Sequence, residues 1–178
     1  MPKIISDLKI MILSAAKEEL FLHGYTTLTI RKIAKKCNIA VGTMYNYFPS
    51  KDMLVAEIIL CDWNHCLTVM KEESEQASDI YSALIAIYDV LKKFRENYRC
   101  CWDQYATQAN GSLVVKERHK MLSTQISSIV TSLLLRLQIK PDDYLAEFTA
   151  EMLLMLSNDD SFCFEQLKEI CHRLYPSK

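Results

Sequence analysis

Residues 29–48 read TIRKIAKKCNIAVGTMYNYF, and this stretch decides the fold. Apolar residues recur in its first half every three or four positions, the spacing of one helix face: Ile30, Ile33, Ala34 and Cys37. Thr29 is a favourable N-cap, and Asn38 can adopt the left-handed conformation that ends a helix. A further short helix is expected at residues 41–47. The pattern therefore predicts two short helices joined by a tight turn.

The composition of the whole chain extends this helical prediction. Half of the 178 residues are hydrophobic, whereas only 3 are Gly and 4 are Pro, too few for the many turns of a β-rich protein. Further helices are expected at residues 7–23, 51–70, 78–98, 99–108, 113–138, 142–157 and 161–174. We therefore predict an all-α protein, with a three-helix head in residues 1–50 and a helical bundle in residues 51–178. The long helix that begins at residue 51 joins the two.

Local signals mark the ends of the first helices. Gly24 lies just after the first helix, where a left-handed C-cap is expected. Pro49 interrupts the chain, Ser50 is a favourable N-cap, and Asp52 lies in a first turn, where the helix dipole favours an acid. These signals set the start of the long helix at residue 51.

Charge is unevenly distributed along the chain. The net charge is −1, but residues 1–51 hold 8 Lys or Arg against 3 Asp or Glu, and the remainder holds 13 against 19. A basic N-terminal part followed by an acidic remainder is typical of a protein that binds a polyanion at one end.

Hydropathy and cysteine usage indicate the compartment. Charges interrupt every apolar run well before 18 residues, and the N-terminus lacks the pattern of a signal peptide. The 7 cysteines are an odd number without the spacing of a disulfide framework. We therefore expect a cytoplasmic protein with mostly buried thiols, no membrane span and no cofactor.

Three short helices with a tight turn between the second and third form a helix-turn-helix, which inserts one helix into the DNA major groove. The residues predicted to face inward are Ile30, Ile33, Ala34, Cys37, Ile39, Met44 and Phe48. Those predicted to face outward are Val41, Gly42, Thr43, Tyr45, Asn46 and Tyr47. Gly42 would allow close approach to a phosphate or a base edge.

Residues 27–59, TLTIRKIAKKCNIAVGTMYNYFPSKDMLVAEII, resemble the N-terminal signature of the tetracycline-repressor (TetR) family of bacterial transcription regulators. The matching elements are residues 24–25, the Thr29 cap, and residues 33–34, 42–45, 47–48 and 50–51. The resemblance covers residues 7–60, about a third of the chain. It implies a homodimeric repressor that binds a palindromic operator and is released by a small-molecule effector.

Carried over position by position, the resemblance assigns contacts to double-stranded operator DNA. Phosphate contacts fall to Thr29, Lys32, Tyr45 and Lys51, and a guanine contact falls to Arg31. Base edges or the adjacent backbone would meet Val41, Gly42, Thr43, Asn46 and Tyr47. The chemistry agrees, because Asn bonds adenine bidentately, Arg bonds guanine, and the methyl groups of Val and Thr suit thymine.

The resemblance also implies that the C-terminal helices form a dimer and enclose an effector pocket. The expected dimer interface comprises Leu145, Phe148, Met152, Met155, Phe162, Leu167, Ile170 and Leu174. The expected pocket comprises Trp63, Leu67, Met70, Tyr88, Phe94, Tyr98, Trp102 and Tyr105. Aromatic and Met side chains suit a neutral or cationic lipophilic ligand. The same residues are also compatible with an ordinary core of the monomer.

An alternative function is that of a TetR-fold protein that acts mainly through a protein partner, as a coactivator or adaptor. Basic residues around the third helix argue against it, because a protein without a DNA role would not require Arg31, Lys32 and Lys51.

A small enzyme or a metal or redox sensor is a further alternative. Cys61 and His65 are four residues apart with Cys66 beside them, and Cys100 and Cys101 are adjacent. Structural zinc requires four ligands, however, and no second pair has matching spacing. The chain also lacks a phosphate-binding glycine loop and a nucleophile elbow. We therefore expect no metal site and no enzymatic activity.

Overall fold

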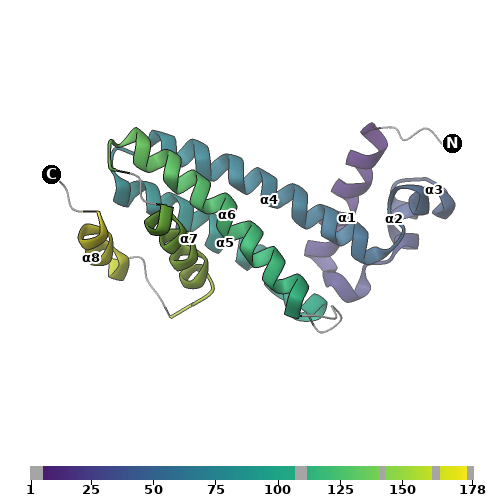
Figure 1. Ribbon diagram of the computed structural model, residues 1–178. Coiled ribbons are helices and arrows are strands. Elements are labelled where there is room, and N and C mark those ends of the chain that lie inside the picture. The colour runs from purple at the N-terminus through teal and green to yellow at the C-terminus, as the bar shows by residue number, and fades with distance from the viewer. Residues whose placement is uncertain (1–5, 107–111, 141–142, 162–164, 176–178) are drawn as a thin grey trace. The chain divides into compact units, whose positions relative to one another are not determined.

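The computed structural model describes residues 6–106, 112–140, 143–161 and 165–175, except for the side chains of residues 6, 100–106, 112–117, 143 and 166–167. Within these ranges the chain forms eight α-helices and no strand (Figure 1). The helices are α1 (Ser6–Thr27), α2 (Ile30–Lys36), α3 (Val41–Tyr47), α4 (Lys51–Gln76), α5 (Ile80–Ala106), α6 (Ser112–Arg136), α7 (Asp143–Ser157) and α8 (Glu165–Leu174). The prediction of an all-α fold is confirmed.

Local hydrogen bonds define the ends of the helices around the turn. The Thr29 hydroxyl accepts a hydrogen bond from the backbone N–H of Lys32 at 3.2 Å and so caps α2. Asn38 has a φ of 53°, the left-handed conformation that the sequence predicts at the end of α2. At the start of α4, the Ser50 hydroxyl accepts from the N–H of Met53 at 3.1 Å.

Gly24 interrupts α1 in a different way from the one predicted. Its φ is positive, 79°, as expected, but its ψ of 169° lies outside the left-handed helical region. Only glycine adopts this combination readily, because it has no Cβ atom. The chain then resumes helical conformation and α1 ends at Thr27.

Like α1, the helices α4 and α5 are longer than predicted. α4 continues to Gln76, six residues beyond the predicted end. α5 is a single helix from Ile80 to Ala106, so the predicted break between residues 98 and 99 is wrong. The segment contains neither Gly nor Pro, and nothing in it interrupts the backbone hydrogen bonds of a helix.

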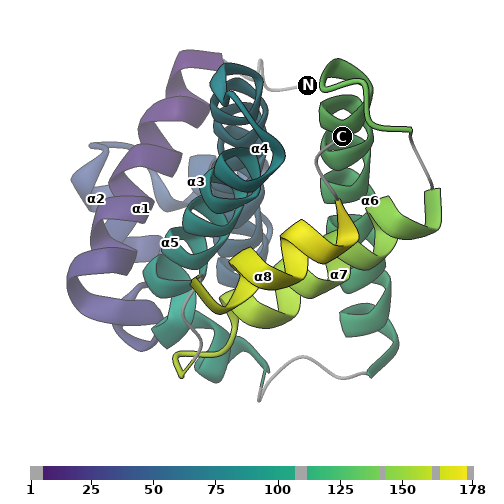
Figure 2. The ribbon, with the colours of Figure 1, turned by 90° about the vertical axis from the view of Figure 1, so that its left-hand side faces the viewer.

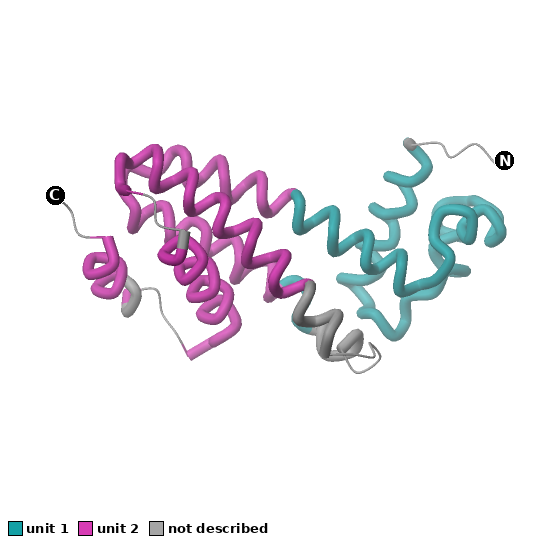
Figure 3. Tube along the Cα trace, viewed as in Figure 1, with its two compact units in different colours: residues 1–64, 97–109 teal, residues 65–96, 110–178 magenta. Residues whose placement is uncertain are grey.

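The helices form two compact units (Figure 3). Unit 1 comprises residues 1–64 and 97–109, and unit 2 comprises residues 65–96 and 110–178. α4 and α5 each contribute residues to both units. The domain boundary predicted at residue 50 divides the chain into two continuous segments, and it remains a prediction.

Unit 1 is built on the packing of α1 against α2 and of α2 against α3. Its fully buried side chains include Ile12, Ala16, Leu20, Leu28, Ile33, Met44, Leu54 and Ile58. Two ion pairs of 2.6 Å connect α1 to α4, one between Lys9 and Glu57 and one between Lys17 and Asp62. The buried Tyr98 of α5 donates its hydroxyl proton to Asp62 at 2.6 Å. These contacts hold the three-helix head to the first turns of α4.

Unit 2 is built mainly on the packing of α6 against α7, which Figures 1 and 2 show side by side. Its buried side chains include Leu84, Ile87, Ile126, Val130, Leu134, Ala150 and Leu153. Arg136, at the end of α6, donates to the carbonyl oxygens of Ser74 at 2.8 Å and Ala77 at 3.0 Å. A guanidinium is favourable there because the last carbonyls of a helix have no intrahelical partner.

By length and composition alone, α4 is long and apolar enough to cross a membrane. Its first half, however, carries Glu57 and Asp62, both paired with lysines of α1. The core residues Trp63 and Met70 also lie on this helix and are buried inside the protein. We therefore attribute the apolar character of α4 to packing within the two units.

Candidate nucleic-acid interface

The turn between α2 and α3 is fixed by backbone hydrogen bonds. The N–H of Cys37 donates to the carbonyl of Ile33 at 2.9 Å, and the N–H of Ile39 donates to that of Ala34 at 2.9 Å. The second bond spans five residues and passes over Asn38, whose positive φ it requires. α3 therefore leaves the turn in one defined direction.

α3 has one buried face and one open face. Met44 is fully buried and Phe48, just after the helix, is 3% exposed, so these two side chains anchor α3 to the head. Gly42, Tyr45 and Asn46 are exposed. Val41, Thr43 and Tyr47 are half-buried. All six residues predicted to face outward thus have accessible surface.

The predicted inward face is buried except at one position. Ile30, Ile33, Ala34 and Cys37 are buried as expected, whereas Ile39 is only half-buried. Burial also raises the pKa of the Cys37 thiol, which keeps it protonated.

Gly42 lies in the first turn of α3 and does not have a positive φ, so the turn does not require glycine at this position. A Cβ atom added at Gly42 would meet no heavy atom within 4 Å among the residues that the structure describes. The head therefore has room for a larger residue here. The absence of a side chain would matter only to a molecule that approaches from outside.

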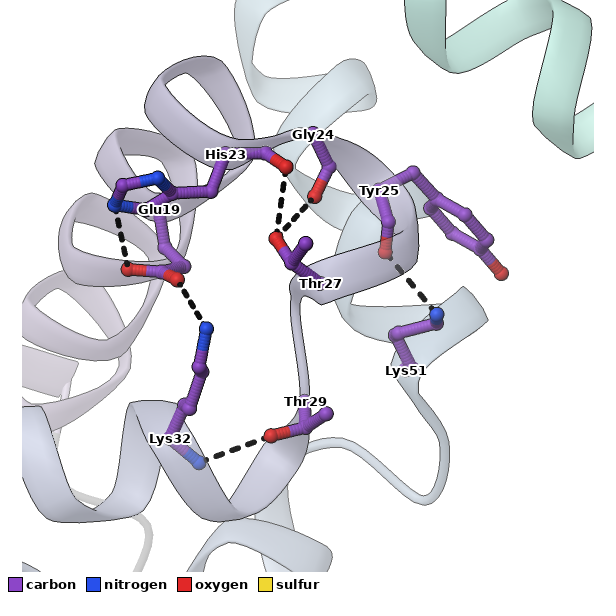
Figure 4. Close-up of polar contacts among 8 residues, drawn as sticks. All are labelled: Glu19, His23, Gly24, Tyr25, Thr27, Thr29, Lys32 and Lys51. Carbon is purple, nitrogen blue, oxygen red and sulfur yellow. Dashed lines mark hydrogen bonds and ion pairs between the residues drawn. The ribbon is translucent and has the colours of Figure 1, made fainter.

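The four basic residues of α2 divide into two pairs. Lys32 forms an ion pair with Glu19 at 3.1 Å, and Lys36 forms one with Glu18 at 2.9 Å, both on α1 (Figure 4 shows the first). The ammonium of Lys32 holds the pKa of the Glu19 carboxyl below its usual value, against the opposing effect of burial. These two lysines are therefore largely neutralised by the protein itself.

Arg31 and Lys35 are exposed, and neither side chain has an ion pair or a hydrogen bond with any other residue that the structure describes. They are four residues apart and so share the flank of α2 that turns away from Glu18 and Glu19. Lys35 was not among the residues assigned to DNA from the sequence. Its spacing from Arg31 is the signal that would have identified it.

Thr29 and Lys51 already have contacts within the protein. The Thr29 hydroxyl caps α2 as an acceptor, which leaves its proton available for a phosphate. The Lys51 ammonium donates to the carbonyl of Tyr25 at 3.1 Å and lies 3.9 Å from the centroid of the Tyr25 ring (Figure 4). An ammonium has three donors, so two remain.

The structure thus brings the ten predicted DNA-contacting residues into one unit, on α2, on α3 and at the start of α4. Exposed cations, hydroxyls, an amide and tyrosine rings occur together on this part of unit 1. Such a surface can bind a polyanion and can read base edges through hydrogen bonds.

The predicted effector pocket falls on both units. Trp63 and Tyr98 belong to unit 1, and Leu67, Met70, Tyr88 and Phe94 belong to unit 2. Four of these six are buried and two, Leu67 and Phe94, are half-buried, as core residues would also be. The side chains of Trp102 and Tyr105 lie outside the described part.

Two hollows within unit 2 are lined by other residues. One, of about 220 Å³ between α4 and α6, is lined by Lys71, Ser74, Glu75, Ser128, Ile129, Ser132, Leu133 and Arg136. The other, of about 340 Å³ between α4 and α5, is lined by Val69, Glu73, Ser82, Ile85, Ala86, Asp89, Val90 and Lys93. Burial raises the pKa of Asp89, although the neighbouring Lys92 acts in the opposite direction.

The predicted dimer-forming residues differ widely in exposure. Large apolar side chains are exposed at Phe148 (54%), Met155 (64%) and Ile170 (43%). Met152 is buried, and Leu145 and Leu174 are half-buried. Phe162 and the side chain of Leu167 lie outside the described part of the chain.

The cysteines show no sign of a metal site where the structure describes them. No group of three or more His, Cys, Asp or Glu in these ranges could hold a metal ion. Cys61 is exposed and Cys66 is half-buried, and burial followed by the charge of Glu57 raises the pKa of the Cys61 thiol. The side chains of Cys100 and Cys101 are not among those that the structure describes.

Comparisons with known proteins agree with this arrangement. Residues 12–58 match the family model of bacterial regulatory proteins, tetR family. Over 165 residues the chain is 29% identical to the HTH-type transcriptional regulator YhgD of Bacillus subtilis (strain 168), a match that covers 84% of this chain and 80% of YhgD.

Two further comparisons differ in how much of the chain they cover. The chain is 38% identical over 64 residues to the HTH-type transcriptional regulator UidR of Escherichia coli (strain K12), covering 36% of this chain and only 33% of UidR. Its fold resembles the crystal structure of the SCO7518 regulator of Streptomyces coelicolor A3(2), with a TM-score of 0.69 at 16% identity over 96% of this chain and 99% of that one.

The fold and the surface of the head define the class of protein, a DNA-binding transcriptional regulator with an N-terminal helix-turn-helix and a C-terminal helical domain. The match over residues 12–58 identifies the N-terminal head as that of the TetR family of bacterial regulatory proteins. Members of this family are transcriptional regulators and not enzymes, which agrees with the interpretation of the sequence.

Proposed function

We propose that the protein is a homodimeric repressor that binds a palindromic operator through α2 and α3 and is released by a small-molecule effector. The observation that carries the DNA part is that Arg31 and Lys35 of α2 pair with no residue that the structure describes and lie in the same unit as the open face of α3. Cations that the protein does not neutralise displace the counterions condensed on the DNA phosphates, and the release of these counterions drives binding.

We assign base reading to the exposed face of α3. Asn46 carries an amide that can bond adenine at two positions, and Arg31 of α2 can add a bond to guanine. Val41 and Thr43 offer methyl groups to thymine, and Gly42 lets the backbone come close. Thr29, Tyr45, Tyr47 and Lys51 would bind the sugar-phosphate backbone or adjacent base edges and so set the register of the head on the duplex. Lys32, predicted from the sequence to bind phosphate, is paired with Glu19 and would contribute less.

For the dimer we propose the exposed face of α7, extended by Ile170 of α8. Tyr144, Phe148 and Met155 are 85%, 54% and 64% exposed and recur at positions that share one helix face. Glu151 lies on the same face and pairs with His119 of α6 at 2.7 Å, and large exposed apolar side chains beside such a pair indicate an interface. A two-fold dimer would present its two α3 helices to half-sites about 34–36 Å apart.

The dimer assignment is tested by Phe148→Glu, which places a charge in the centre of this face. Light scattering should show the wild-type protein at twice the mass of one chain and the variant at the mass of one chain. As a matched control, Glu147→Gln alters a neighbouring exposed residue outside this face and should leave the dimer intact. A Phe148→Glu variant that remains dimeric would refute the assignment.

We further propose that the effector is a neutral or cationic lipophilic molecule that contacts some of the aromatic and Met residues of α4 and α5. The support is their chemistry, since aromatic and Met side chains line most apolar ligand sites. An effector that prefers one conformation of the dimer shifts the population toward it and lowers DNA affinity by its differential affinity for the two states.

One selection experiment tests the DNA-binding part. The purified protein is incubated with a pool of random duplexes, bound DNA is enriched over several rounds, and the affinity of the enriched duplex is measured between 50 and 200 mM salt. We expect an inverted-repeat sequence and a log–log salt slope of about −0.9 per phosphate contacted. A folded protein that enriches no sequence would favour the alternative, an adaptor that acts through a protein partner.

The cytoplasm, and the nucleoid when the operator is occupied, are the corresponding proposed locations.

A further inference from the structure

We propose that Tyr25 positions Lys51 for DNA binding, so that the ammonium of Lys51 is held where a phosphate can reach it. The proposal rests on the DNA-binding function proposed above. The proposal goes beyond the DNA contacts assigned above, because Tyr25 is not one of the residues that contact DNA. Tyr25 acts only through Lys51.

Lys51 is held at two points by the same residue. Its ammonium lies 3.9 Å from the centroid of the Tyr25 ring and donates to the Tyr25 carbonyl oxygen at 3.1 Å. Among the other described lysines near aromatic rings, the ammonium lies 5.4 to 5.9 Å from the ring centroid. A lysine side chain has four flexible bonds, and this contact with ring and carbonyl restricts them.

The ring that holds Lys51 is itself fixed. Tyr25 is 3% exposed, and its hydroxyl donates to the carboxylate of Asp52, the residue that follows Lys51 on α4. On its other side, Tyr25 follows Gly24, whose φ of 79° and ψ of 169° turn the chain out of the preceding helix. The Tyr25 side chain thus joins the end of α1 to the first turn of α4.

The local environment of α4 would not hold a cation by itself. Lys51 is the first residue of α4, and the N-terminus of a helix carries a partial positive charge that disfavours an ammonium. The Tyr25 carbonyl and the negative face of its ring offset this repulsion. Only one of the three ammonium protons is used by the carbonyl, so the remaining two can bind a phosphate.

The test uses the duplex that the wild-type protein selects and compares the salt slope of four variants: Tyr25→Leu, Tyr25→Phe, Lys51→Ala and Tyr25→Leu with Lys51→Ala. A dimer with one Lys51 on each half-site loses two phosphate contacts in Lys51→Ala, which flattens the slope by about 1.8. Tyr25→Leu removes the ring face and should flatten the slope by nearly as much. The double variant should show no further change.

Tyr25→Phe is the matched control, because it keeps the ring and the carbonyl and removes only the hydroxyl. It should keep the wild-type slope, because burial still holds the ring in place after the hydroxyl bond to Asp52 is lost. If Tyr25→Leu lowers the melting temperature but keeps the wild-type slope, Tyr25 is only a core residue and the proposal fails. If the wild-type protein selects no duplex at all, the proposed function fails first, before any variant is made.

A second measurement does not depend on DNA or on the folding of Tyr25→Leu. In protein labelled with ¹³C-lysine, the Lys51 signal is assigned by its absence from Lys51→Ala. Protons above an aromatic face are shielded, so the ε-methylene signal of Lys51 should lie upfield of those of the other lysines. A Lys51 signal at the position of exposed lysines would overturn the proposal.

Discussion

Lys35 and Lys36 are adjacent lysines on α2 that differ in one respect. Lys36 forms an ion pair of 2.9 Å with Glu18, whereas the side chain of Lys35 has no ion pair with any described residue. The perturbation is Lys35→Ala, compared with deletion of the Glu18–Lys36 pair as a whole by Glu18→Gln with Lys36→Ala. The pair deletion leaves the net charge unchanged, whereas Lys35→Ala lowers it by one per chain.

The expected magnitude follows from the number of phosphates that lose a cation. If each chain places one Lys35 on a phosphate, a dimer loses two contacts, and the log–log salt slope flattens by about 1.8. Because the salt concentration rises fourfold between 50 and 200 mM, the loss of affinity over that range shrinks by about 12-fold relative to wild type. The pair deletion should change the slope by less than about 0.5, since its two charges already cancel.

The assay is fluorescence anisotropy with the selected duplex at four or more salt concentrations, after circular dichroism has shown that each variant is folded. Equal flattening by Lys35→Ala and by the pair deletion would refute the reasoning, because it would mean that the ion pairs with α1 do not withhold lysines from DNA. An unchanged slope in Lys35→Ala would show that this flank of α2 does not contact phosphates.

Three further predictions concern the free energy of unfolding of the protein and its dependence on pH. Thr29→Ala should lower the free energy of unfolding by about 1 kcal/mol in urea titrations, because α2 loses its N-cap, while Thr29→Ser should retain the stability; equal losses would argue against the cap. Asp62→Ala should cost about 1–3 kcal/mol, because the buried hydroxyl of Tyr98 loses its acceptor. Adding Tyr98→Phe should recover part of this cost, and strictly additive losses would contradict the explanation. The backbone N–H of Ser82, which donates to Asp79 at 2.9 Å, holds the pKa of Asp79 below its usual value. Its stabilisation is therefore complete above about pH 4, the unfolded-state value, and is lost as the pH falls through the lower folded-state value. Asp79→Asn should remove that part of the acid dependence in urea titrations at several pH values, and an unchanged acid profile would exclude Asp79 as its source.

Much of the head could be predicted because its signals are local. The Thr29 cap, the left-handed Asn38 and the Ser50 cap depend on residues only three or four positions apart. They can therefore be predicted from the sequence alone. The predicted break between residues 98 and 99 of α5 is wrong because no local signal supports it: no Gly or Pro interrupts the chain there.

The sequence by itself determined the helical class, the position of the turn and the set of residues able to bind DNA, because helix spacing and capping depend on near neighbours. Only the tertiary structure decided which cations remain unneutralised. Lys32 and Lys36 meet acids on α1 that lie 13 and 18 residues away in sequence, whereas Arg31 and Lys35 meet none among the described residues. It also decided that Lys51 lies against the Tyr25 ring, 26 residues away, and that residues 97–109 join the N-terminal unit. Contacts between distant segments depend on how the helices pack, and no local pattern records that.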